Sequence, residues 1–183
     1  MLSILRAGAG PQGVRVFTEH TVETAPPASR AAMERTAAAF GQVPNAVARL
    51  AESPELLNGF LEMTAAFDRT TLDPVAREVV IMTVATRNDC HVCVTMHTGK
   101  LRRLGASPEL ITALREGRAL SDERLEAVRQ FTHTVLATAG AVPDADLEAF
   151  LAHGRTERNA LEVVLGIGTY TMSTLANRLT RAA

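Results

Sequence analysis

The sequence predicts an all-α fold in which the helices pack in a bundle behind an extended N-terminal arm. Almost no segment of the 183 residues alternates apolar and polar side chains with the period of two that marks a half-buried strand. From Ala28 onward, apolar residues recur at helical spacing between helix-start and helix-stop residues. We therefore divide the chain into an arm over residues 1–27 and one helical domain over residues 28–183.

The N-terminal segment is punctuated by glycine and proline and carries little hydrophobic pattern, which is typical of an extended arm. Residues 14–17 within it could form a short strand. Ser29 follows two prolines and is the expected N-cap of an alanine-rich helix that ends near Phe40. A second, short helix is predicted over residues 44–50.

Two start signals open the next two helices, each an N-cap residue followed by proline at the first helical position. Ser53 precedes a helix whose apolar residues recur at helical spacing as far as Phe67. Asp73 precedes a helix over residues 75–86 that is apolar nearly all round, which marks a helix buried in the core. Glu78 is the only acidic residue of this second helix.

Asn88 and Asp89 interrupt the apolar pattern and are expected to supply the N-cap of a helix over residues 90–104. Gly105 follows this helix and suits the left-handed conformation that ends many helices. Ser107, again followed by proline, is expected to start a helix that ends at Gly117. The remaining helices are predicted from Asp122 to Ala139, from Pro143 to His153 and from Glu157 to Arg181.

Composition and charge exclude several classes of function. Hydrophobic residues make up 46% and charged residues 21%, which is an ordinary balance for a soluble globular protein. A net charge of −1 and an aromatic content of 4% provide neither the field nor the stacking surface of a nucleic-acid binder. The longest apolar region, residues 161–175, is shorter than the ~18 consecutive apolar residues of a membrane span. We expect neither a nucleic-acid nor a membrane partner.

The two cysteines of the chain, Cys90 and Cys93, form a Cys-x-x-Cys pair. The N-terminus has no pattern of a signal peptide, so we expect a cytoplasmic protein in a reducing compartment. In that compartment such a pair is more often catalytic or metal-binding than a passive structural bridge.

Cys90, Cys93 and His97 share one face of their predicted helix. Residues advance by ~100° along an α-helix, so these three fall within a ~60° sector, and Cys93 and His97 form an i, i+4 pair. Cys90 is expected in the first turn, where unpaired N–H groups and the positive end of the helix dipole stabilise a thiolate. His97 can take a proton from Cys93, and Glu78 is the natural carboxylate to orient His97.

Two other interpretations of the cysteine pair stay open. A zinc site needs four ligands, usually from two separated pairs, whereas the sequence offers one pair, with His91 pointing ~100° away from Cys90. Both cysteines could also be structural core residues, because a free cysteine packs well. We expect no bound metal and no cofactor.

The spacing of these residues resembles the signature of the AhpD-like branch of the carboxymuconolactone decarboxylase family. The resemblance covers roughly Phe40 to Arg178 and includes a Phe-Gly-x-Val-Pro-Asn opening at residues 40–45 and Asn177. It implies an AhpD-like all-helical fold, thiol-dependent reduction of alkyl hydroperoxides, and a homo-oligomer, a trimer or hexamer. The motif lies near the middle of this chain, whereas the best-known AhpD proteins carry it late. Lactone decarboxylases of the family typically lack the cysteine pair.

By position, the resemblance makes Cys93 the peroxidatic cysteine and Cys90 the resolving, proton-donating cysteine. It makes His97 and Glu78 the proton relay. The expected enzyme is an antioxidant peroxidase whose cysteine pair is oxidised by a hydroperoxide and re-reduced by an external dithiol or a disulfide reductase. A reductase of protein or small-molecule disulfides would use the same cysteines, and a non-enzymatic redox or metal sensor is a further alternative.

Overall fold

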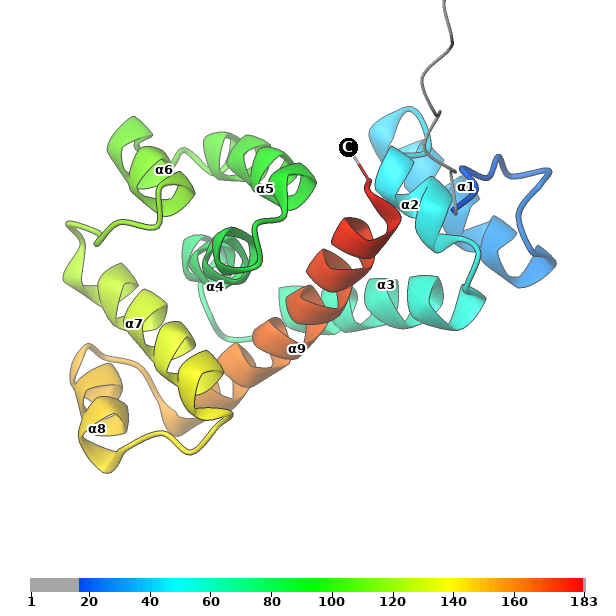
Figure 1. Cartoon of the computed structure of the whole chain (residues 1–183). Coiled ribbons are helices and arrows are strands. Elements are labelled where there is room, and N and C mark those ends of the chain that lie inside the picture. Colours follow the sequence, from blue (N-terminus) through cyan, green and yellow to red (C-terminus); the bar gives the residue numbers. More distant parts are fainter. Residues whose placement is uncertain (1–16, 183) are drawn as a thin grey trace, which may run out of the picture.

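The computed structural model describes residues 17–182, which form nine helices and no strand (Figure 1). This confirms the predicted all-α fold. The helices are α1 (Pro27–Phe40), α2 (Asn45–Leu50), α3 (Pro54–Asp68), α4 (Pro74–Arg87), α5 (His91–Arg103), α6 (Pro108–Arg115), α7 (Glu123–Thr138), α8 (Asp144–Ala152) and α9 (Glu157–Thr180).

α4 is the central helix of the main hydrophobic core, where it packs against α5, α6, α7 and α9 (Figure 1). Its apolar residues from Val79 onward, among them Val80 and Met82, are buried, as the all-round apolar pattern predicts. The long helix α9 leaves this core and reaches α2 and α3 at the other end of the molecule. There α1, α2 and α3 form a second, smaller core that includes Ala176 of α9.

The predicted combination of an N-cap and a following proline is confirmed at three helix starts. The side chains of Ser53, Asp73 and Ser107 each accept a hydrogen bond from a backbone N–H in the first turn of α3, α4 and α6. Each is followed by a proline whose missing N–H needs no partner at that position. These three starts therefore depend on local sequence alone.

Ser29 is not an N-cap, and that prediction is wrong. α1 begins at Pro27, and its N-cap is Pro26, three residues before Ser29. The Ser29 hydroxyl is buried and donates a hydrogen bond of 2.7 Å to the carbonyl oxygen of Ala51. The hydroxyl that was expected to cap α1 therefore joins α1 to the end of α2 instead.

The prediction that Asn88 and Asp89 cap α5 is also wrong. Asn88 ends α4, Asp89 has a left-handed φ of 52°, and Cys90 is the N-cap residue of α5. The side chains of Asn88 and Asp89 contact α9 instead, so they are not available to the backbone of α5. Cys90 therefore lies just before the helix, and Cys93 lies in its first turn.

Residues 17–26 precede α1 and contact the helices that follow. His20 Nε2 lies 2.6 Å from Glu52 Oε2, Ala25 is buried, and Val22 packs against the second core. Residues 1–16, with most of the possible strand over 14–17, lie outside the described residues. The boundary of the arm at residue 27 stays a prediction.

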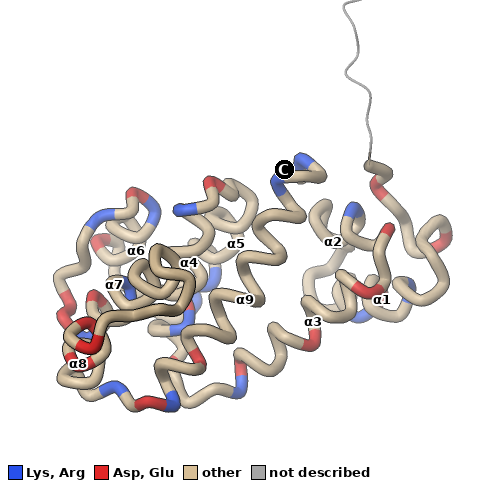
Figure 2. Tube along the Cα trace, turned by 60° about the horizontal axis from the view of Figure 1, so that its bottom comes forward, with Lys and Arg blue, Asp and Glu red and all other residues tan. Residues whose placement is uncertain are grey.

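The middle of α9 is uncharged, and its charged residues lie near the two ends of the helix (Figure 2). One face of α9 is buried by α3 and α4, whereas Leu161, Leu175 and Leu179 on another face are 73%, 56% and 69% exposed. None of the helices in the described chain is both long enough and apolar enough to span a membrane.

Gly166 allows α9 to approach α3 and α4 closely. A Cβ atom at this position would lie 2.6 Å from Phe67 Cζ and 3.0 Å from Val80 Cγ1. We expect Gly166→Ala to lower the free energy of unfolding by about 1–3 kcal/mol because the core is overpacked. Gly168→Ala is the matched control, since its Cβ would be 4.0 Å from Met63 Cε and alanine favours a helix by about 1 kcal/mol. Equal urea midpoints for the two variants would contradict this packing.

Candidate active site

His97 and Lys100 of α5 both contact the buried carboxylate of Glu78 on α4. His97 Nδ1 lies 2.7 Å from Glu78 Oε2, and Lys100 Nζ lies 3.1 Å from the other carboxylate oxygen, Oε1. Glu78 is fully buried, whereas the other two side chains are partly exposed. α5 presents His97 and Lys100 three residues apart, so both reach the same carboxylate of α4.

The carboxyl group of Glu78 is ionised at neutral pH despite its burial. Burial raises the pKa of Glu78, but the hydrogen bond from His97 and the charges of His97 and Lys100 lower it to below its usual value. Because an ionised carboxylate only accepts hydrogen bonds, Nδ1 of His97 carries the proton. Nε2 of a neutral His97 is then the nitrogen that can accept a proton.

Tyr170 of α9 fixes the other side of the His97 ring. The two rings meet edge to face, with their centroids 5.3 Å apart, and Phe60 and Phe67 pack around Tyr170. Burial raises the pKa of the Tyr170 phenol, and the nearby charges of Glu78 and Asp68 raise it further, so the ring stays neutral. The orientation of His97 is thus set by a carboxylate on one side and an aromatic ring on another.

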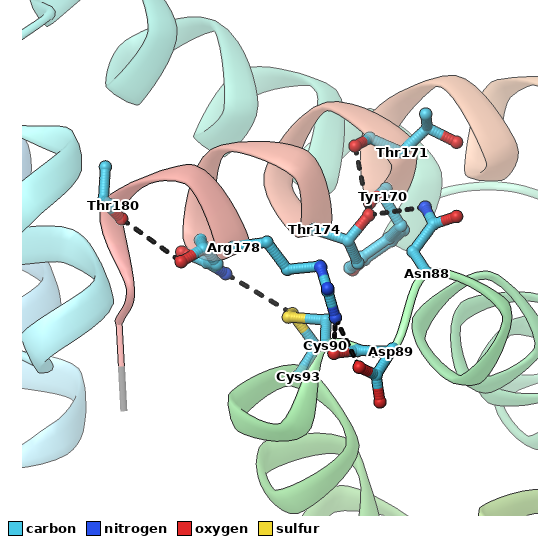
Figure 3. The surroundings of a disulfide bond; sticks show 10 residues. Asn88, Asp89, Cys90, Cys93, Tyr170, Thr171, Thr174, Arg178 and Thr180 are labelled. Atoms are coloured by element: carbon cyan, nitrogen blue, oxygen red, sulfur yellow. Dashed lines mark hydrogen bonds and ion pairs between the residues drawn. A yellow bond between two sulfur atoms is a disulfide. The ribbon is translucent and has the colours of Figure 1, made fainter.

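Cys90 and Cys93 are joined by a disulfide bond, with their Cα atoms 5.4 Å apart (Figure 3). The two residues are only 2% and 5% exposed and pack with Ala85 of α4. Cys93 is the third residue of α5, so the backbone N–H groups around it are those that lack partners within the helix. Cys90 at the N-cap and Cys93 in the first turn therefore both lie where the N-terminal end of the helix favours a thiolate.

The C-terminal part of α9 holds the turn that carries the cysteines (Figure 3). Asn88 donates a hydrogen bond of 2.8 Å to Thr174, and Asp89 Oδ2 lies 2.6 Å from Arg178 Nη1. Beside these contacts, the buried side chain of Asn177 donates from Nδ2 to Cys93 Sγ over 3.3 Å. α9 therefore fixes the cysteine turn and also contacts one of its sulfur atoms.

The structure brings the four sequence-predicted site residues together as two pairs. Glu78 contacts His97, and Cys90 is bonded to Cys93. The hydrogen bonds of the described residues include none between His97 and either sulfur. His97 lies four residues after Cys93, so about 6 Å of helix rise separates them. A proton transfer between them would need a bridging water molecule or a rotation of the cysteine side chain.

Sequence reasoning missed Lys100, Tyr170 and Asn177 as site residues. Lys100 was detectable, because it lies seven residues after Cys93 and so on the same face of the helix. Tyr170 and Asn177 come from α9, and no local pattern connects that helix to the cysteine turn.

The structure also tests where His91 points and whether side chains gather that could bind a metal ion. The side chain of His91 is 90% exposed, which confirms that it points away from the cysteine pair. The described part of the chain contains no group of three or more His, Cys, Asp or Glu side chains that could hold a metal ion.

Comparison with protein families matches residues 51–133 to the model of the carboxymuconolactone decarboxylase family. This segment contains Glu78, Cys90, Cys93 and His97. No match was found among curated proteins.

Solved structures share the fold at low sequence identity. An AhpD-core, uncharacterized peroxidase-related protein from Ralstonia eutropha JMP134 is 21% identical, with a TM-score of 0.81 over 91% of this chain and 90% of that one. A peroxidase-related protein from Silicibacter sp. TM1040 is 21% identical, with a TM-score of 0.76 over 97% and 95%. The debrominase Bmp8, solved with 2,3,4-tribromopyrrole, is 14% identical, with a TM-score of 0.71 over 92% and 90%. Residues 51–133 therefore belong to the carboxymuconolactone decarboxylase family, and the chain has the AhpD-like fold.

Proposed function

We propose that this protein is a thiol-dependent peroxidase that reduces hydroperoxides in the reducing cytoplasm. The observation that carries the proposal is the buried Glu78–His97 pair, which lies one helical turn from a cysteine pair that can form a disulfide. An ionised carboxylate that fixes a histidine beside a thiol is the arrangement that activates a cysteine nucleophile. The peroxidase-related neighbours of the same fold are consistent with this chemistry.

In the first step His97 Nε2 accepts the proton of Cys93, directly or through water. The Cys93 thiolate attacks the terminal oxygen of the hydroperoxide, so that an S–O bond forms and the O–O bond breaks. The departing alkoxide takes the proton from His97 and leaves as an alcohol. Cys93 is oxidised to a sulfenic acid, and the hydroperoxide is reduced by two electrons.

In the second step the Cys90 sulfur attacks the sulfenic sulfur of Cys93. An S–S bond forms and the S–O bond breaks, and the hydroxide takes the Cys90 proton and leaves as water. An external dithiol or a disulfide reductase then reduces the bond by thiol–disulfide exchange and is itself oxidised to a disulfide. The spacing of the two cysteines, 5.4 Å between Cα atoms, is within the range that a disulfide requires.

Turnover with a panel of donors tests this proposal. The reduced protein is given tert-butyl hydroperoxide with dihydrolipoamide, glutathione or dithiothreitol, and alcohol formation is measured alongside donor oxidation. We expect one alcohol per dithiol oxidised. Reduction of a disulfide substrate without any peroxide consumption would instead make the protein a disulfide reductase. Zinc bound to the reduced protein, without turnover, would support the metal-sensor alternative.

Asn177 is expected to stabilise the Cys93 thiolate through its Nδ2–H donor. A hydrogen bond to a charged group is worth about 1.5–3 kcal/mol, so Asn177→Ala should raise the pKa of Cys93 by about 1–2 units. The rate of alkylation against pH, measured in a Cys90→Ser background, reads this pKa. The control is Asn58→Ala, which also removes an amide donor, but one that bonds the Ala28 carbonyl oxygen away from the cysteines. The same pH profile in both variants would refute a role for Asn177.

We also propose that the chain forms a homo-oligomer, a trimer or hexamer. The exposed leucines of α9 support this, because they form an apolar surface that a soluble monomer would leave in water. Light scattering at micromolar concentration should give a mass above that of one chain, and Leu175→Lys/Leu179→Lys should reduce it. A stable monomer before substitution would contradict the proposal.

A further inference from the structure

A cavity of about 790 Å³ lies beside the Glu78–His97 pair, between α1, α2, α3 and α5. We call it the apolar cavity because most of its lining is apolar, with Val47, Phe60 and Leu61 among the contributing residues. His97 and Tyr170 form part of its wall. Its volume falls within the range of about 300–1,000 Å³ that is usual for small-molecule sites.

The cavity continues the helix face that carries the peroxidatic cysteine. Cys93, His97 and Lys100 follow one another along one face of α5, and the last two line the cavity. The proton-accepting residue of the proposed reaction therefore lies between the sulfur and the cavity. Cys93 itself does not line the cavity, so a ligand there would reach the sulfur only by extending past His97.

The charged residues of the lining are mainly cationic. Arg35 and Arg103, which we call the rim arginines, are both exposed, and neither side chain has an ion pair or hydrogen bond with another described residue. The remaining charged side chains of the lining, those of Lys100 and Asp68, lie 3.5 Å apart. The cavity thus combines an apolar interior with two cations that have no anionic partner.

We propose that the apolar cavity binds the substrate of the proposed peroxidase, and that this substrate is an amphipathic carboxylate hydroperoxide. Its hydrocarbon chain occupies the apolar interior, its carboxylate pairs with the rim arginines, and its hydroperoxide group lies past His97 toward Cys93. Arginine recognises carboxylates through two parallel N–H donors, which suits this role. The inference rests on the proposed function, because only a peroxidase would turn such a ligand over.

Charge complementarity favours this ligand over the N-terminal segment of the chain itself. Residues 1–16 contain Arg6 and Arg15 and no acidic side chain, so they offer the rim arginines no side-chain anion. A neutral apolar ligand would leave both arginines unused. A carboxylate on an apolar chain satisfies both parts of the site.

Binding to the disulfide form of the full chain tests the cavity without any turnover. Titration calorimetry compares decanoate with decan-1-ol and with decyltrimethylammonium. We expect decanoate to bind at least about tenfold more tightly than decan-1-ol, and Arg35→Gln/Arg103→Gln to remove this difference. The matched control is Arg102→Gln/Arg115→Gln, which removes two exposed, unpaired arginines outside the cavity lining. It should keep the preference.

Equal affinity of the unsubstituted protein for decanoate and decan-1-ol would overturn the proposal. An equal loss of the preference in both arginine double variants would also overturn it, because general charge would then explain the binding. Displacement of decanoate by a synthetic peptide of residues 1–16 would overturn the proposal and assign the cavity to that segment. A decanoate affinity that falls as the protein concentration rises would overturn it too and assign the cavity to a second copy of the chain.

A turnover comparison separates failure of this inference from failure of the proposed function. The value of kcat/KM is measured for linoleic acid hydroperoxide, for its methyl ester and for tert-butyl hydroperoxide. We expect kcat/KM for the acid to exceed kcat/KM for the methyl ester by at least about tenfold. Equal turnover of acid and ester would overturn the substrate class and leave the peroxidase intact. Decanoate binding without turnover of any peroxide would overturn the peroxidase and leave a carboxylate-binding cavity.

Discussion

Replacing Glu78 by glutamine should lower peroxide turnover by about 10²-fold or more, the range expected when acid–base assistance is lost. Glutamine keeps the shape of the side chain and can still accept a hydrogen bond from His97 Nδ1. It removes the negative charge that stabilises a protonated His97, so transfer of the Cys93 proton becomes harder. The pKa of Cys93 should rise toward the free value of about 8.5.

The pKa of Cys93 can be read directly from alkylation rates against pH in Cys90→Ser and in Cys90→Ser/Glu78→Gln. The matched control is Glu162→Gln, which alters a buried carboxylate on α9 that is held by Thr71, Arg158 and Asn159. This control should cost stability but leave the pH profile of Cys93 unchanged. If Glu78→Gln behaves as Glu162→Gln does, then Glu78 is a structural residue and has no part in the relay.

Replacing each cysteine by serine should have two different outcomes. Cys93→Ser removes the nucleophile, and peroxide consumption should fall to the uncatalysed rate. Cys90→Ser leaves the nucleophile but removes the resolving thiol, so one equivalent of peroxide should be consumed per chain and a sulfenic acid should remain on Cys93. Mass spectrometry after dimedone trapping identifies the modified residue.

The structure explains why we assign these roles and not the reverse. Both cysteines lie at the N-terminal end of α5, but among the described residues only the sulfur of Cys93 accepts a side-chain hydrogen bond, from Asn177. This hydrogen bond stabilises a thiolate at Cys93. Dimedone found on Cys90 in Cys93→Ser, together with no adduct in Cys90→Ser, would exchange the two roles.

The fold was largely predictable from sequence, because its helix starts are encoded locally. Ser53, Asp73 and Ser107 cap their helices with their own side chains and are followed by proline, so no distant residue is needed. Ser29 and Asn88 carry equally good capping groups but use them in contacts with α2 and α9. A single sequence does not show which polar side chains are taken up by tertiary contacts.

The site residues likewise include some that the sequence could predict and some that it could not. The contact between Glu78 and His97 could be predicted because an isolated acid in an apolar helix needs a partner, and His97 shares a helix face with Cys93. Tyr170 and Asn177 could not be assigned, because their roles depend on where α9 crosses the cysteine turn. The apolar cavity is formed by residues from five separate helices, so no local pattern marks it.

A single-turnover experiment tests the central claim most directly. The fully reduced protein is mixed with one equivalent of tert-butyl hydroperoxide in the absence of any donor, and free thiols, alcohol and the intramolecular disulfide are quantified over time. The Glu78–His97 relay predicts one alcohol and one Cys90–Cys93 disulfide per chain, at a rate that falls by about 10²-fold in Glu78→Gln. Thiol loss at the rate of free cysteine, unchanged in Glu78→Gln, would show that these residues do not form a peroxidase site.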